Sequence, residues 1–293
     1  MGISPFGSFF GRHEFLIRRL HSLTGAVFVG GYLAFHLITN AAVIDGAATY
    51  QRRADQIHVV GPTTLFFLEW GLVLLPILFH GLIGMVIVAR GKRNVLTYRY
   101  QGNIRYTLQR ITGVLVFAFI LWHVFQMRGW FEIPWWREHV TRRLGGGLFD
   151  YHNAAATAGA AIRASKLIVA AYVLGVVFSV YHLANGLWTM GATWGVWTSV
   201  PAQRRANVPC TMIGIALLAV GLGALLGMLR VPVATGPATA ASLAAVLGGV
   251  GLLVYESAER KPGDCPNFRP TKMGLSPSRR LRSFFGRSNG KGH

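Results

Sequence analysis

The chain is poor in charged residues and in cysteine. Only 13% of its 293 residues are charged, whereas a soluble domain carries about a quarter, so a soluble globular fold is disfavoured. Two isolated cysteines, Cys210 and Cys265, support neither an iron–sulfur cluster nor a disulfide framework. The absence of a C-x-x-C-H run excludes covalent attachment of a c-type haem.

Acidic residues are scarce too. The 10 Asp and Glu stand against 29 Lys and Arg, which leaves a formal charge of +19. In a soluble chain this excess would suggest a nucleic-acid partner. Here the basic residues lie in loops and in a tail around long apolar stretches, so we attribute them to the positive-inside rule and to anionic lipids. We expect no nucleic-acid partner.

Long apolar segments are what the chain has in abundance, since 52% of its residues are hydrophobic. Segments of about twenty apolar residues cross about 30 Å of hydrocarbon as helices. The sequence therefore predicts an all-α integral membrane protein, a bundle of five to six transmembrane helices. The predicted spans are residues 22–44, 63–89, 106–127, 166–190, 208–229 and, rich in Ala and Gly, 231–255.

This pattern divides the chain into four regions. They are a basic arm (1–20), a four-helix core (21–206), one or two further transmembrane helices (207–255) and a basic tail (256–293). Most Lys and Arg residues fall on the side of the membrane that holds the N-terminus, so we predict that this side is the inside.

Four spans carry one histidine each: His36, His80, His123 and His182. A histidine in hydrocarbon is costly and marks a functional site by default. At about 1.5 Å per residue, His36 and His123 lie about 20–24 Å from the inner edge, and His80 and His182 about 15 Å from it. The depths predict an outer pair, His36 with His123, and an inner pair, His80 with His182.

Facing histidines in a helix bundle are typical axial ligands of b-type haem. We therefore predict two bis-histidine haems inside the first four spans. The alternative is four structural histidines that form hydrogen bonds between helices, but matched depths on four spans favour haem. The cytochrome b of the bc complexes, with two ligands on each of two helices, fits a one-per-helix pattern less well.

The segments around these histidines carry motifs in a specific order. They are RRLHSLTG at 18–25, LPILFHG at 75–81, QRITG at 109–113, WH at 122–123, YHLANGLW at 181–188 and TWG at 193–195. RLHSLTG at 19–25 echoes RITG at 110–113, and each begins a span that later carries a histidine. From about residue 14 to 229 the chain resembles the di-haem cytochrome b membrane-anchor subunit of succinate:quinone oxidoreductases, the succinate dehydrogenase and fumarate reductase family.

The resemblance implies an electron-transfer and quinone-site subunit of succinate dehydrogenase. The four histidines match the family's axial ligands of two haems b, and the quinone is expected to be menaquinone. No dinucleotide fingerprint or cysteine cluster occurs in the chain, so succinate oxidation belongs to flavoprotein and iron–sulfur partner subunits. The implied location is the bacterial inner (cytoplasmic) membrane, with a cytoplasmic N-terminus. Family members usually stop after five spans, so the sixth span and the tail depart from the pattern.

Further site residues follow from the chemistry of these cofactors. Glu69 is the only acid inside a span, lies level with the outer pair and resembles a glutamate of relatives. We therefore expect it to serve proton transfer at a quinone site; the alternative is an interfacial side chain.

Haem propionates need basic or hydroxyl partners, and the inner-side candidates are His21, Ser22 and Arg110, although Ser22 suits a helix cap as well. A last set of basic residues is expected to dock the soluble partner or to reflect topology alone: Arg12, Arg18, Arg19, Arg90, Lys92, Arg93, Arg99 and Arg105.

Two alternative functions stay open on the sequence. One is a cytochrome b anchor of another respiratory oxidoreductase, such as a hydrogenase or formate dehydrogenase. The other is an assembly anchor that binds haem without catalytic use.

Overall fold

The computed structural model describes residues 5–91 and 95–229, and helices dominate this part of the chain. The described residues belong to one compact unit. In chain order the elements are α1 (Pro5–Leu23), η1 (Thr24–Val29), α2 (Gly30–Ala41), η2 (Ala42–Asp45), α3 (Ala47–His58), α4 (Pro62–Leu68), η3 (Glu69–Leu74), α5 (Leu75–Arg90), α6 (Gln101–Arg128), α7 (Pro134–Trp136), η4 (Arg137–Thr141), η5 (Tyr151–Asn153), α8 (Ala154–Arg163), α9 (Lys166–Thr193) and α10 (Val200–Met228).

Five helical segments of the described chain are long and apolar enough to span a membrane. They are Gly11–Asp45, Pro62–Arg90, Gln101–Arg128, Lys166–Thr193 and Val200–Met228. The predicted all-helical membrane fold is thereby confirmed, and each of the first five predicted spans coincides with one segment. The predicted sixth span (231–255) and basic tail (256–293) lie outside the described residues.

Residues 5–20 of the predicted basic arm (1–20) are helical and continue into the first span. Two connections between spans differ from the sequence prediction. The segments read as loops before the second span and before the fourth span contain α3 and α8, which are half-buried helices. Small residues explain them, because Ala54, Ala154 and Ala158 are at most 7% exposed and let these short helices pack closely on their neighbours.

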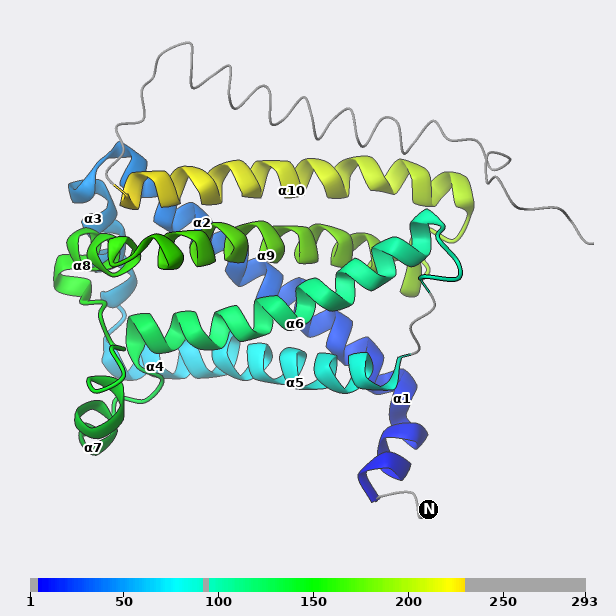
Figure 1. Cartoon of the computed structure of the whole chain (residues 1–293), viewed down its shortest axis with the longest axis horizontal. Coiled ribbons are helices and arrows are strands. Elements are labelled where there is room, and N and C mark those ends of the chain that lie inside the picture. Colours follow the sequence, from blue (N-terminus) through cyan, green and yellow to red (C-terminus); the bar gives the residue numbers. More distant parts are fainter. Residues whose placement is uncertain (1–4, 92–94, 230–293) are drawn as a thin grey trace, which may run out of the picture. The chain divides into compact units, whose positions relative to one another are not determined.

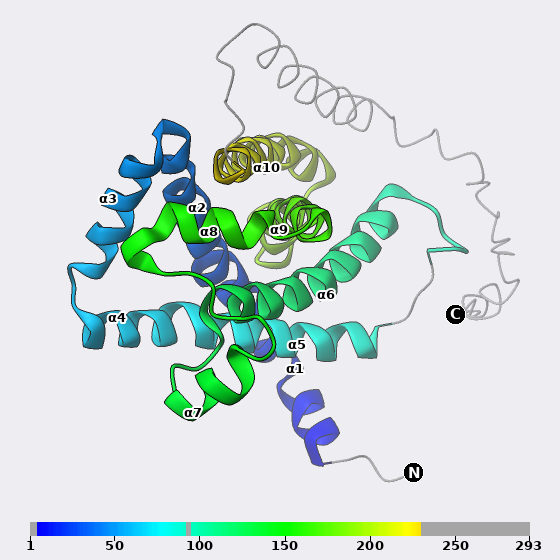
Figure 2. The ribbon, with the colours of Figure 1, turned by 60° about the vertical axis from the view of Figure 1, so that its left-hand side comes forward.

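Helix α9 is central to the packing. It packs against α6 on one side and α10 on the other, and α10 also packs against α2. Helices α9 and α10 run side by side in both views, while α5 lies beside α6 (Figure 1, Figure 2). Large apolar side chains such as Leu167 and Phe67, which are 83% and 68% exposed, cover the outside of the bundle, as expected for helices surrounded by lipid.

The bundle has two ends that differ in what they carry. The α8 end carries the short helices α3, α7 and α8, and the α1 end carries the start of α1 and the α5–α6 connection (Figure 1). At the α8 end, Tyr50 of α3, Ile162 of α8, Tyr172 of α9 and Met228 of α10 form one buried cluster. This cluster holds the short helices against the long ones.

Two spans contain a turn of π-helix. The first is η1, and the second, η3, runs directly into Pro76 of α5. A proline inside a long helix removes a backbone donor and clashes with the preceding turn, and a wider turn relieves that clash. Turns of this kind are frequent at functional sites; η3 begins at Glu69, and η1 contains Gly25.

Candidate functional site

The four span histidines meet as two pairs inside the bundle. His80 of α5 and His182 of α9 have ring centroids 6.1 Å apart, with ring planes at 81°. His36 of α2 and His123 of α6 have centroids 6.0 Å apart, with planes at 75°. These are the partners that helix depth predicts. The His36–His123 pair lies toward the α8 end and the His80–His182 pair toward the α1 end.

The spacing of both pairs suits a metal held between two imidazoles. Metal–imidazole bonds are about 2 Å long, and a ring nitrogen lies about 1 Å from its centroid, so axial imidazoles on one ion have centroids about 6 Å apart. Bis-histidine iron in a porphyrin needs only two protein ligands, because the macrocycle supplies the other four. Within the described ranges, no group of three or more His, Cys, Asp or Glu side chains could hold a metal alone.

The ring nitrogens of the His80–His182 pair are oriented by backbone carbonyls. Nδ1 of His80 donates to the carbonyl oxygen of His21 at 2.9 Å, and Nδ1 of His182 donates to that of Gln109 at 3.1 Å. A carbonyl can only accept, so both rings carry their proton on Nδ1 and present a lone pair at Nε2. The side-chain amide nitrogen of Gln109 lies 3.4 Å from Nε2 of His182. A hydrogen bond at the other ring nitrogen is the usual support of a metal-binding histidine.

His123 obtains the same support from side chains. Nδ1 of His123 lies 3.1 Å from the hydroxyl of Tyr172, and that hydroxyl donates to the side chain of Gln126 at 2.8 Å. Gln126 in turn donates to the carbonyl of Ala161 in α8 at 3.2 Å. Because the Tyr172 hydroxyl proton is already engaged, the hydroxyl accepts from Nδ1 and again leaves Nε2 free.

Glycines on neighbouring helices make room for the histidines near the α1 end. A Cβ at Gly25, in the π-turn η1, would overlap the ring of His80. A Cβ at Gly113 of α6 would lie 2.8 Å from Cε1 of His182, which is closer than real Cβ contacts. Both positions therefore require glycine, and they are the glycines of the two echoing sequence motifs.

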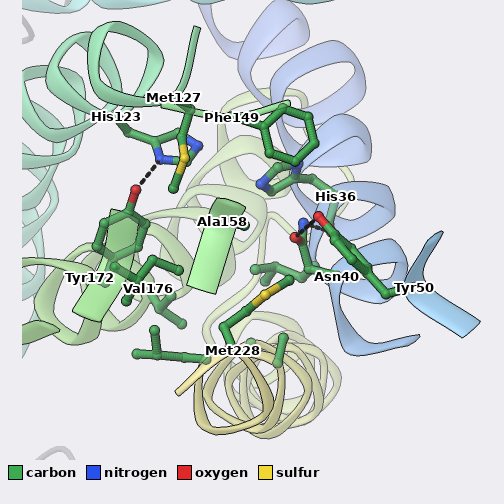
Figure 3. Close-up of a pocket in the computed structure, with 15 residues that line it drawn as sticks. His36, Asn40, Tyr50, His123, Met127, Phe149, Ala158, Tyr172, Val176 and Met228 are labelled. Atoms are coloured by element: carbon green, nitrogen blue, oxygen red, sulfur yellow. Dashed lines mark hydrogen bonds between the residues drawn. The ribbon is translucent and has the colours of Figure 1, made fainter. Parts of the chain in front are cut away.

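A cavity adjoins the other pair, and apolar side chains dominate its wall. Figure 3 shows His36 and His123 on its wall, with Tyr172 bonded to His123 and Tyr50 bonded to Asn40. The lining residues are His36, Leu37, Asn40, Tyr50, His123, Met127, Phe149, Ala158, Ile162, Tyr172, Val176, Gly221, Ala224, Leu225 and Met228. An apolar wall with a few convergent polar groups is typical of a cofactor pocket.

Tyr50 and Asn40 on this wall form a connected set of hydrogen bonds. Tyr50 donates to the side chain of Asn40 at 3.0 Å, and Asn40 donates to the carbonyl of His36 at 2.7 Å. Burial raises the pKa of Tyr50, on the short helix α3, to about 12. Tyr50 therefore remains a neutral donor that supports the turn of α2 after His36.

The structure places two predicted haem-contact residues around the His80–His182 pair. The ring of His21 stacks on that of His80, with centroids 4.0 Å apart and planes at 7°. Arg110 donates to the carbonyl of Ile87 in α5 at 2.7 Å. In the part of the chain that the structure describes, the only buried side-chain polar atoms without a hydrogen-bond partner are Nδ1 of His21 and Nε of Arg110.

Unpaired buried polar atoms are costly. Nε of Arg110 is a donor, and Nδ1 of His21 is a donor in the tautomer that protonates it, so these two atoms suit the carboxylates of a bound ligand near the α1 end. Ser22, the third candidate, is already engaged. It donates to the carbonyl of Arg19 at 3.0 Å and accepts from the indole of Trp194 at 2.8 Å.

Glu69 forms an ion pair that the sequence analysis did not include. Its carboxylate is bonded to Arg128, the last residue of α6. Arg128 also contacts Glu132 at 3.3 Å. Glu69 therefore lies at the same end as the His36–His123 pair, as its depth predicts, but beside a cation. An acidic and a basic residue at the same depth on two different spans indicate an ion pair between those spans, so this pair could have been predicted from the sequence.

Other residues that support the pairs were missed for a similar reason. Gln109, Gln126 and Asn185 are polar residues in apolar spans, and the last two follow His123 and His182 by one turn. A polar residue one turn from an intramembrane histidine lies on the same helix face. That spacing is the signal by which they could have been found.

The basic residues expected at the docking surface have different surroundings. Arg12, Arg18 and Arg99 are exposed, and Arg19 stacks on Phe15 and Trp194. Arg105 is instead directed toward α9 and α10, where it bonds to Asn185 and Asn207. Lys92 and Arg93 lie outside the described residues.

Comparison with known proteins supplies the family. No protein-family model matches the chain. A curated protein does: the chain is 31% identical over 217 residues to the succinate dehydrogenase cytochrome b558 subunit of Bacillus subtilis, and the match covers 73% of this chain and 97% of that protein. With that identity and coverage, joined to five membrane-spanning helices, the chain belongs to the family of succinate dehydrogenase cytochrome b membrane-anchor subunits.

Proposed function

We propose that this chain carries electrons between the soluble arm of a succinate dehydrogenase and a membrane quinone through two bis-histidine haems b. His80 and His182 would hold one haem, called the inner haem, and His36 and His123 would hold the other, called the outer haem. The observation that carries the proposal is the pair of 6 Å ring separations. Haem supplies, when bound, an iron that accepts and returns one electron.

The residues around the ligands have defined roles in this proposal. The carbonyls of His21 and Gln109 and the hydroxyl of Tyr172 orient three of the four imidazoles. Gly25 and Gly113 leave the space that the rings occupy. The unpaired Nδ1 of His21 and Nε of Arg110 bind propionates of the inner haem, whereas Ser22 supports Trp194.

The partners follow from the family. A flavoprotein subunit and an iron–sulfur subunit oxidise succinate and deliver electrons at the α1 end. Arg12, Arg18 and Arg99 are exposed there and suit an acidic docking surface. The protein spans the bacterial cytoplasmic membrane with its N-terminus in the cytoplasm, in accordance with the positive-inside rule.

Quinone, with menaquinone favoured, reacts at the α8 end. Glu69 is the carboxylate placed for proton transfer there, and it forms an ion pair with Arg128. A quinone that takes up electrons also takes up protons. An acid at the level of the outer haem, rather than the inner one, means that electrons cross most of the membrane before they reach the quinone.

The test is the haem content of the purified complex and of ligand variants. The wild-type complex should contain two haems b per copy of this chain. His80→Ala should remove one haem and His123→Ala the other, as measured by pyridine haemochrome and by redox titration. His139→Ala is the matched control, since His139 is exposed, and it should keep both haems. One haem in the wild type, or no loss in either ligand variant, would reject the assignment.

The use of haem as an assembly anchor without electron transfer is the remaining alternative. Family membership sets aside a hydrogenase or formate dehydrogenase anchor. If succinate reduces at least one haem in the intact complex faster than the enzyme turns over with quinone, the electron-transfer role stands. If neither haem is reduced at that rate, the haems are structural.

A further inference from the structure

Arg105, near the start of α6, joins three transmembrane helices. Its Nε donates to the side chain of Asn185 in α9 at 2.8 Å, and one terminal nitrogen donates to Asn207 in α10 at 2.9 Å. The guanidinium carbon lies 4.1 Å from the ring centroid of Trp188 in α9. A planar cation with directed donors and an aromatic face is held in one orientation by such a set.

The same network reaches a haem ligand of the proposed inner site. Asn185 donates to the side-chain oxygen of Gln109 at 2.7 Å. The side-chain amide of Gln109 donates to the backbone carbonyl of His182 at 3.1 Å, and the backbone carbonyl of Gln109 accepts from Nδ1 of His182. Arg105 and Gln109 lie one turn apart on α6, as His182 and Asn185 do on α9, so the two helices are joined along facing edges.

The charge of Arg105 is not balanced by a carboxylate in the described part of the chain. Its hydrogen-bond acceptors are two neutral amides. The ionisable groups that act on it electrostatically are Tyr181 and Cys210, and phenols and thiols are neutral at physiological pH. In a partly buried environment of low dielectric, an unbalanced charge acts over a longer distance than it does in water.

We propose that Arg105 is a positioning residue of the inner haem site, which fixes His182 through Asn185 and Gln109 and raises the reduction potential of the haem held there. This inference rests on the proposed function, because it requires that His182 binds haem iron. Reduction lowers the charge of the iron by one, so a nearby positive charge favours the reduced state. The inner haem becomes the better electron acceptor, which suits the haem nearest the soluble arm.

The experiment is a redox titration of haem absorbance in the intact complex. Arg105→Gln removes the charge and keeps a hydrogen-bonding side chain, so the inner-haem potential should fall while the outer-haem potential stays unchanged. Arg105→Lys keeps the charge and should retain most of the wild-type potential. Asn207→Asp keeps the size and the acceptor but places a negative charge beside the guanidinium, and it should lower the inner-haem potential as well.

The outcomes separate this inference from the function on which it rests. The His80→Ala and His123→Ala complexes identify which titration step belongs to which haem. If the wild type titrates as two haems but Arg105→Gln and Asn207→Asp leave both potentials unchanged, or if Arg105→Lys shifts the inner potential as far as Arg105→Gln does, the role of Arg105 is refuted. If the Arg105→Gln complex loses the inner haem, its potential cannot be measured, and the inner-haem potential of the Asn207→Asp complex decides whether Arg105 acts through its charge. A wild type without two bis-histidine haems refutes the proposed function instead.

Discussion

The two histidine pairs have nearly the same ring separation, 6.1 and 6.0 Å, but different surroundings. Around the pair near the α1 end, Arg105 contributes positive charge without a carboxylate partner among the described residues. At the α8 end, the cation Arg128 is balanced by two carboxylates, and the cavity wall beside the pair is mainly apolar.

Two sites with the same pair of ligands can therefore have different reduction potentials. Groups that contact the ligands, and the polarity of their surroundings, also tune the potential of a metal centre. The proposed inner haem should therefore titrate at the higher potential and the outer haem at the lower one. Three substitutions test whether the two pairs differ in this way.

The largest effect is expected from Gly25→Val, which acts on the pair near the α1 end alone. The new side chain would occupy the space of the His80 ring, and a close-packed interior cannot absorb it without displacement. We expect loss of the inner haem and retention of the outer one, measured as haem per chain and by the remaining titration step. Gly31→Val is the matched control, because a Cβ at Gly31 meets nothing within 4 Å. Equal haem content in both variants would contradict the assignment of Gly25.

A moderate effect is expected from Tyr172→Phe, which acts on the other pair. The substitution removes the hydroxyl that accepts from Nδ1 of His123 but keeps the ring. Loss of such a partner weakens metal binding by about 10- to 100-fold. The outer haem should therefore transfer to apomyoglobin faster by at least about 10-fold, while the inner haem is unaffected. Tyr100→Phe serves as control, since Tyr100 is 56% exposed; faster loss of the inner haem instead would reverse the comparison.

The smallest effect is expected from Arg128→Gln, which removes the balanced charge at the α8 end. Arg128 and Glu69 are 33% and 29% exposed, between surface and buried pairs, so we expect a loss of about 1 kcal/mol in the stability of the complex. The measurement is the thermal denaturation of the complex. Glu132→Gln, at a carboxylate 64% exposed, should cost less than about 0.5 kcal/mol. A larger loss in the Glu132 variant would show that Arg128 serves Glu132 rather than Glu69.

Much of the fold could be predicted from the sequence because a membrane constrains it strongly. Apolar length alone identified the first five spans, since backbone groups in lipid must be satisfied within the segment. The half-buried helices α3 and α8 were read as loops. They are too short to be recognised as spans by apolar length, and their burial depends on Tyr172, Leu225 and Met228 of the long helices α9 and α10.

The candidate site was also predictable only in part. Rise per residue along a helix sorted the four histidines into two pairs and placed Glu69 at the level of one of them, because depth in a membrane helix follows directly from counting. Which polar atoms stay unpaired does not follow from counting. The hydroxyl of Ser22 accepts a hydrogen bond from the indole of Trp194, and Arg128 is the cation beside Glu69. Both contacts depend on how the helices are rotated against each other.

The first five spans, the depths of the four histidines and their pairing partners could therefore be predicted from the sequence, because hydrocarbon requires a minimum length and apolarity of each spanning segment. Tertiary structure alone decided what surrounds each pair. It brought Tyr172 to one histidine, Gly25 to another, and Arg105 to Asn185 and Asn207 across three helices. Side-chain contacts between helices depend on rotation and crossing, which packing of the whole bundle sets and no single segment encodes.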